Sequence, residues 1–163
     1  MPNSRCVTLG IRAGLLGGFA VAAFFFLLDL ARLEPLATPF ALGTTLLGPF
    51  GSAIETPVLA ELVSVTAFAG NLLALTLLHF LAFSLLGISA VRGCEACRIP
   101  LNVVTGALFG LVICSLVFYG CVALGGNYVL AGIPGPVAVF GGNLVGGAVM
   151  GGYLQFTTPG EEA

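Results

Sequence analysis

Few side chains in this chain of 163 residues could do chemistry, and its only histidine, His79, is the first candidate. It lies within the apolar run LTLLHFLAF. Along a helix, Arg92 is about 20 Å away and Glu61 about 27 Å away, so the imidazole is expected well inside a bilayer in its neutral form. Three roles are open to it: a ligand to haem or chlorophyll, a proton relay, or a hydrogen bond to a neighbouring helix. We favour the hydrogen bond.

The pigment and haem roles each lack a partner in this sequence. A haem held by two histidines would need the second one from another chain, because His79 is the only one here. The Ala-x-x-x-His pattern of light-harvesting polypeptides is not met, since Leu75 occupies the alanine position. The sequence therefore requires no cofactor, and cofactor binding at His79 is kept as an alternative.

Two asparagines are expected inside the membrane as well. Asn71 and Asn143 would each lie about 10–15 Å below the outer end of a helix. Carboxamides at similar depth can bond across a helix interface, which contributes about 0.6–2 kcal/mol. We predict a structural pair. In the alternative interpretation, Asn71, His79 and Asn143 line a polar path through a small transporter or channel.

The cysteines supply one short motif, Cys94-Glu-Ala-Cys97. Arg92 and Arg98 flank it and would favour a reactive thiolate. Four spans with a CxxC resemble the quinone-coupled disulfide-forming enzymes, but those carry a second loop pair and work on the oxidising face. Here the motif is predicted in a cytoplasmic loop, where Cys6 would complete only three of the four ligands of a zinc site. Cys94 and Cys97 are kept as a possible redox pair, and no metal site is predicted.

Acidic residues gather near the opposite side of the predicted membrane. Asp29 falls near the outer end of the first span, three residues before Arg32, so an interfacial ion pair between them is expected. In the alternative, Asp29 binds or gates cations together with three nearby acids, Glu34, Glu55 and Glu61.

The elements that must position these residues are membrane helices. Charged residues make up 7% of the chain and the mean hydropathy is +1.13, whereas soluble domains carry roughly a quarter charged residues. A helix needs about 20 apolar residues to cross a bilayer. The sequence predicts one all-α membrane domain over residues 1–163, a four-transmembrane-helix bundle with spans at about 10–30, 62–91, 101–124 and 136–156.

The segment Pro35–Pro57 between the first two spans is apolar but broken by proline and glycine. We predict that it lies at the outer interface, with a short helix after a Thr38-Pro39 start. A re-entrant loop is the alternative, and it would need protein or water around its free backbone groups.

Arginine placement predicts the orientation, because arginine concentrates in cytoplasmic loops. With four spans, Arg32 falls on one side and the other four arginines fall on the side of both termini. We therefore expect cytoplasmic termini in the inner membrane of a bacterium, since a chain with arginine but no lysine is common in GC-rich bacterial genomes.

Small residues four apart mark faces on which membrane helices approach closely. The predicted packing glycines lie in the first, third and fourth spans: Gly10, Gly14, Gly18, Gly106, Gly110, Gly142, Gly146, Gly147 and Gly151. They predict a tight bundle, and one face could also dock an oligomer or a larger complex.

The sequence contains no catalytic constellation, which favours a non-enzyme. There is no basic cluster, so nucleic acid is excluded as a partner. The leading prediction is a small inner-membrane protein with a structural or accessory role, whose partners are membrane lipid and either copies of itself or other membrane subunits. The alternatives are the transporter or channel, and a redox or cofactor protein that uses His79 or the Cys94/Cys97 pair.

Overall fold

The computed structural model describes residues 3–47, 57–124 and 135–158, and these residues form helices and short connections without any strand. Four of the helical stretches are long and apolar enough to cross a membrane: Ser4–Ala31, Phe68–Cys97, Val103–Leu124 and Pro136–Thr157. Each overlaps one predicted span. The first two helices are longer than predicted, because polar residues at their ends continue the helix beyond the apolar run.

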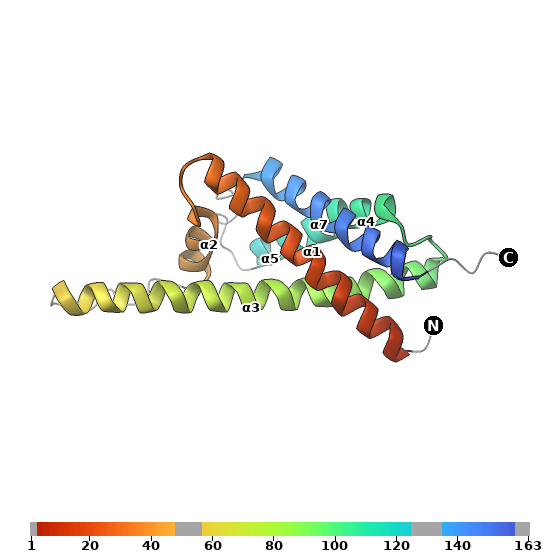
Figure 1. Cartoon of the computed structure of the whole chain (residues 1–163), viewed down its shortest axis with the longest axis horizontal. Helices are drawn as coiled ribbons and strands as arrows, with labels where there is room; N and C mark the ends of the chain where they lie inside the picture. The colour runs from red at the N-terminus through yellow and green to blue at the C-terminus, as the bar shows by residue number, and fades with distance from the viewer. Residues whose placement is uncertain (1–2, 48–56, 125–134, 159–163) are drawn as a thin grey trace.

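Helix α1 (Asn3–Ala31) occupies the centre of the bundle. It packs on one side against α3 (Pro57–Cys97) and on the other against α7 (Pro136–Thr157). Helix α4 (Val103–Phe109) covers the far side of α7, so the order across the molecule is α3, α1, α7, α4. Figure 1 shows the start of α1 at the same end of the bundle as the ends of α3 and α7.

The third predicted span is one continuous helical stretch with a change of pitch in the middle. It begins at Asn102, whose side chain accepts a hydrogen bond from the Thr105 N–H at 2.9 Å and caps α4. A wider π-helical turn, η1 (Gly110–Cys114), then leads into α5 (Ser115–Leu124). Helix α4 packs closely on α7, whereas α5 makes little contact with it.

The segment predicted at the interface contains a short helix, α2 (Ala37–Leu47), which packs mainly against α3 and also against α1. Its first turn includes the expected Thr38-Pro39 pair. The Phe40 and Phe68 rings, with centroids 5.5 Å apart, join α2 to α3. The rest of this segment, 48–56, lies outside the described residues.

Glycines occupy the three helix crossings, where backbones approach closely. At α1–α3, a Cβ on Gly10 would come within 2.5 Å of the Ile88 Cα, and one on Gly87 within 2.8 Å of the Gly14 nitrogen. At α1–α7, a Cβ on Gly146 would lie 2.9 Å from the Gly17 carbonyl oxygen. Gly17 and Gly87 are not among the packing glycines predicted from their four-residue spacing.

The α4–α7 crossing has the same character over two turns. A Cβ on Gly110 would lie 2.8 Å from the Gly147 Cα, and one on Gly106 2.5 Å from the Gly151 Cα. No side chain could be added at these positions without moving a backbone. That glycine packing drives assembly in a bilayer stays a prediction.

Candidate functional site

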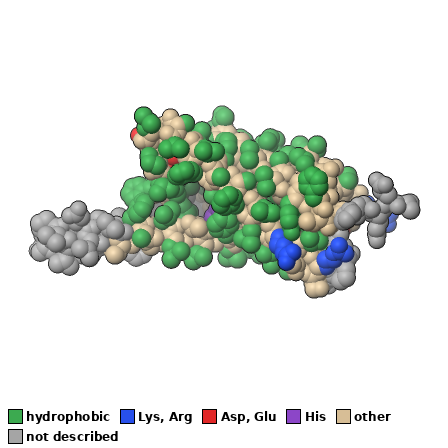
Figure 2. Space-filling model, in the orientation of Figure 1, with side chains coloured by type: hydrophobic (Ala, Val, Ile, Leu, Met, Phe, Trp, Pro, Cys, Tyr) green, Lys and Arg blue, Asp and Glu red, His purple; other side chains and the backbone are tan. Residues whose placement is uncertain are grey.

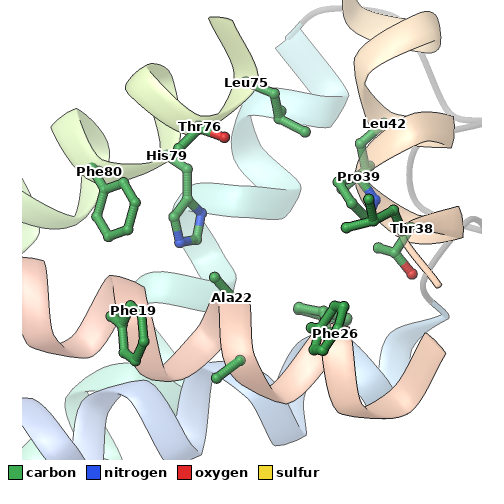
Figure 3. Close-up of a pocket in the computed structure, with 13 residues that line it drawn as sticks. Phe19, Ala22, Phe26, Thr38, Pro39, Leu42, Leu75, Thr76, His79 and Phe80 are labelled. Atoms are coloured by element: carbon green, nitrogen blue, oxygen red, sulfur yellow. The ribbon is translucent and has the colours of Figure 1, made fainter. Parts of the chain in front are cut away.

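A cavity with a volume of about 420 Å³ lies between α1, α2 and α3. That volume is within the range of small-molecule sites, roughly 300–1,000 Å³. Figure 3 shows side chains from all three helices around this space. The principal lining residues are Phe19, Ala22 and Phe26 of α1, Thr38, Pro39 and Leu42 of α2, and Leu75, Thr76, His79 and Phe80 of α3.

His79 is the one ionisable side chain in this lining. Its Nε2 lies 2.9 Å from the carbonyl oxygen of Gly18 on α1. Because a carbonyl oxygen only accepts, Nε2 carries the hydrogen and donates it. The ring also packs against Phe83, with centroids 4.8 Å apart, and edge-on against Phe80, at 5.5 Å. His79 thus joins α3 to α1 while one edge of its ring faces the cavity (Figure 3).

Thr38 holds the α2 wall of the cavity in place through a buried carboxylate. Asp29, at the end of α1, is 1% exposed. Its Oδ2 accepts the Thr38 backbone N–H at 2.8 Å and its Oδ1 accepts the Thr38 hydroxyl at 2.7 Å. One of the unsatisfied N–H groups of the first turn of α2 is thereby capped by a side chain from another helix.

This arrangement differs from the expected ion pair between Asp29 and Arg32. Among the described residues no ion pair forms between these two, and Arg32 is exposed while both oxygens of Asp29 are bonded to Thr38. The reason is that the chain reverses after α1 and brings the start of α2 over the carboxylate. The alternative, a cation site, includes Glu55 and Glu61. Glu55 and the side chain of Glu61 lie outside the described residues.

The two asparagines have different surroundings. Asn143 of α7 donates its amide hydrogen to the Ser115 hydroxyl of α5 at 3.1 Å. Asn71 of α3 is buried, and within the described part of the chain no hydrogen bond joins it to Asn143. His79 meanwhile bonds to Gly18. A path shared by Asn71, His79 and Asn143 stays a prediction.

The CxxC motif lies in the last turn of α3 rather than in a loop, because this helix runs on to Cys97. Cys94 is buried and Cys97 is exposed, and none of the five cysteines forms a disulfide. The Cys6 thiol of α1 donates to the Glu95 carboxylate, at 3.2 Å from Oε2. Within the described residues no cluster of three potential metal ligands occurs.

Charged side chains lie at the two ends of the bundle. Figure 2 shows arginine at the end where α1 begins and acidic side chains at the end where it finishes. The basic end carries four exposed arginines: Arg5, Arg12, Arg92 and Arg98. The surface between the ends is dominated by apolar side chains (Figure 2), as expected of a surface that faces lipid.

Sequence reasoning found His79 but missed the cavity beside it. No local sequence pattern marks Phe19, Ala22 or Phe26 as lining residues. They are apolar like other positions of α1, and they line a cavity only because of the way α2 packs beside α1 and α3. The signal that was available is the Thr38-Pro39 helix start, which predicts where α2 begins but not which helix it packs on.

Comparison with profiles of known protein families, with curated proteins and with solved structures finds no match.

Proposed function

We propose that this protein is a multi-pass integral membrane protein with a structural or accessory role, and that it works as a subunit of a homo-oligomer or of a larger membrane complex. The observation that carries the proposal is the surface of α3. Within the described structure, only 11% of the apolar membrane-spanning stretch of α3 is buried, against 44% of the corresponding stretch of α7. Helix α3 is thus the most open to neighbours in the membrane.

The open side of α3 carries a regular apolar ridge. Leu73, Leu77, Leu81 and Leu85 follow one another at intervals of four residues, and each is between 57% and 63% exposed. Residues four apart lie on one face of a helix. Because helices in lipid associate through close packing rather than through a hydrophobic driving force, such a ridge can contact lipid tails or another helix.

The length of α3 favours contact with another helix. Its 41 residues span about 60 Å, which is about twice the 30 Å of bilayer hydrocarbon. Residues 57–67 continue past α2 and α1 (Figure 1). A helix of this length reaches beyond the hydrocarbon at one end, where a neighbouring subunit or the membrane interface can contact it.

Native mass spectrometry of the full chain, purified in mild detergent from its own membrane, tests the proposal. We expect a defined oligomer or a complex with larger subunits. A visible spectrum of the same sample would reveal a haem or chlorophyll, which belongs to the cofactor alternative. A lone monomer, with no partner recovered, would contradict an accessory role.

Cysteine crosslinking then tests whether α3 is the contact. In a background without the native cysteines, Leu77→Cys should give a crosslinked dimer or an adduct to a partner subunit. The matched control is Leu116→Cys on α5, which is 67% exposed and also apolar. Crosslinks at Leu116 alone would move the interface to α5 and refute the role of α3.

A further inference from the structure

We infer that the cavity between α1, α2 and α3 binds a lipid-soluble molecule that bears a hydroxyl group, such as an alkylphenol or a long-chain alcohol, and that His79 Nδ1 accepts the hydrogen of that hydroxyl. This inference is independent of the assembly proposed above. It depends on the direction of each hydrogen bond around the cavity.

The hydrogen-bond donors of the polar side chains that line the cavity are all used in hydrogen bonds within the protein. His79 donates its Nε2 hydrogen to Gly18. The Thr76 hydroxyl donates to the Leu72 carbonyl four residues back, at 2.6 Å. The Thr38 hydroxyl donates to Asp29, and so does the Thr38 backbone N–H. These side chains therefore offer no hydrogen to a bound molecule.

His79 Nδ1 is the remaining nitrogen acceptor, beside the weaker acceptor oxygens of the Thr38 and Thr76 hydroxyls. In a neutral imidazole the nitrogen that lacks a hydrogen accepts, and here that nitrogen is Nδ1 because Nε2 donates. Among the described residues Nδ1 has no hydrogen-bond partner. In Figure 3 the Nδ1 edge of the ring is turned toward the open space in front of Pro39 and Leu42.

The remaining lining favours an apolar body that includes a ring. Phe19, Phe26 and Phe80 supply aromatic faces from two helices, and Pro39 and Leu42 supply aliphatic surface from α2. A hydroxyl bonded to Nδ1 inside this lining would satisfy a polar group that has no other partner. A ketone, an ester or an ether brings only acceptors and would leave Nδ1 unsatisfied.

The test compares para-octylphenol with its methyl ether para-octylanisole, in which a methyl group replaces the hydroxyl hydrogen. The full chain, labelled with ¹⁵N-histidine, gives one pair of ring nitrogen signals because the chain has one histidine. Without a probe we expect a protonated Nε2 and an unprotonated Nδ1. The phenol should move the Nδ1 signal and bind roughly tenfold more tightly than the ether, the factor expected from one buried hydrogen bond.

Two variants keep the result interpretable. His79→Phe keeps a planar ring at this position but has no acceptor nitrogen, so the preference for the phenol should disappear. Leu42→Trp narrows the cavity without touching the His79–Gly18 bond and should weaken both probes. The matched control, Thr157→Val, removes a hydroxyl that bonds to its own helix far from the cavity and should change nothing.

Four outcomes would overturn the inference. These are equal binding of phenol and ether, which indicates a general site for acyl chains; binding of neither probe; a proton on Nδ1 rather than Nε2; and a Nδ1 shift that survives Leu42→Trp, which places the probe elsewhere.

Discussion

At the scale of single residues, backbone conformation decides how α3 ends. Arg98 follows the helix with φ of 55°, in the left-handed region that glycine favours. The Ile99 N–H bonds to the Cys94 carbonyl at 2.9 Å and the Arg98 N–H to the Glu95 carbonyl at 3.3 Å. This pair of bonds is the Schellman arrangement, in which glycine is the usual residue at the Arg98 position.

Arg98→Gly should therefore stabilise the protein by about 1 kcal/mol, because it relieves the cost of a left-handed conformation. The matched control is Arg92→Gly, an exposed position in the interior of the same helix, which should destabilise by about 1 kcal/mol. Equilibrium unfolding in mixed micelles measures both. Destabilisation by Arg98→Gly would show that the guanidinium has a role that the backbone conformation does not explain.

The buried carboxylate supports a second prediction at this scale. Asp29→Ala removes both acceptors of Thr38 and should cost about 1–2 kcal/mol, with faster hydrogen exchange in the first turn of α2. Asp29→Asn keeps one acceptor and should have a smaller effect. If the exchange of α2 is unchanged in Asp29→Ala, the helix is held by its contacts with α3 and not by the cap.

At the scale of helices, two glycines of α3 have opposite surroundings. A Cβ on Gly87 would contact the Gly10 carbonyl and lie 2.8 Å from the Gly14 nitrogen, whereas one on Gly93 would meet nothing within 4 Å. Both residues are helical, so intrinsic helix propensity favours alanine equally at each. The difference between the two substitutions isolates the contact with α1.

Gly87→Ala is expected to destabilise by about 1–3 kcal/mol through overpacking of two backbones. Gly93→Ala is expected to be neutral or to stabilise by up to about 1 kcal/mol. Unfolding of both variants under one set of conditions gives the comparison. Equal effects of the two substitutions on the free energy of unfolding would mean that α1 and α3 separate easily at this crossing. That outcome would contradict close packing of the two backbones at Gly87.

At the scale of the whole molecule, the two ends differ in charge. The end that carries the start of α1 has four exposed arginines, and arginine concentrates on the cytoplasmic side of membrane proteins. We accordingly propose that this end, where α1 begins and α7 ends, faces the cytoplasm of a bacterial inner membrane.

Thiol labelling checks the orientation. A variant that retains only Cys97, which is exposed at the basic end, should react with a membrane-impermeant maleimide only after the inner membrane is permeabilised. Leu33→Cys in a cysteine-free background should react in intact spheroplasts, because Leu33 is 87% exposed at the opposite end. The reverse pattern of labelling would invert the topology.

The four long apolar helices could be predicted from sequence because each is a local property: about 20 apolar residues with few charges. The Thr38-Pro39 pair is also a local signal, and it predicts the start of α2 to within about one residue of the observed start at Ala37. The third span was predicted as uniform, and its π-helical turn at Gly110–Cys114 was missed, because a change of pitch leaves no mark in hydropathy. The CxxC was placed in a loop because Arg92 was taken to end the span, although an arginine can extend a helix beyond the hydrocarbon.

The class of element, the approximate limits of the spans and the single histidine in an apolar helix follow from the amino-acid sequence. The partners of these residues follow from the fold: His79 bonds to Gly18, Asp29 bonds to Thr38 instead of Arg32, and Asn143 bonds to Ser115. The physical reason is that hydropathy depends on a residue and its near neighbours, whereas a hydrogen-bond partner depends on how separate helices cross. Several crossings are compatible with the same apolar pattern, and the close approach of glycine backbones selects among them.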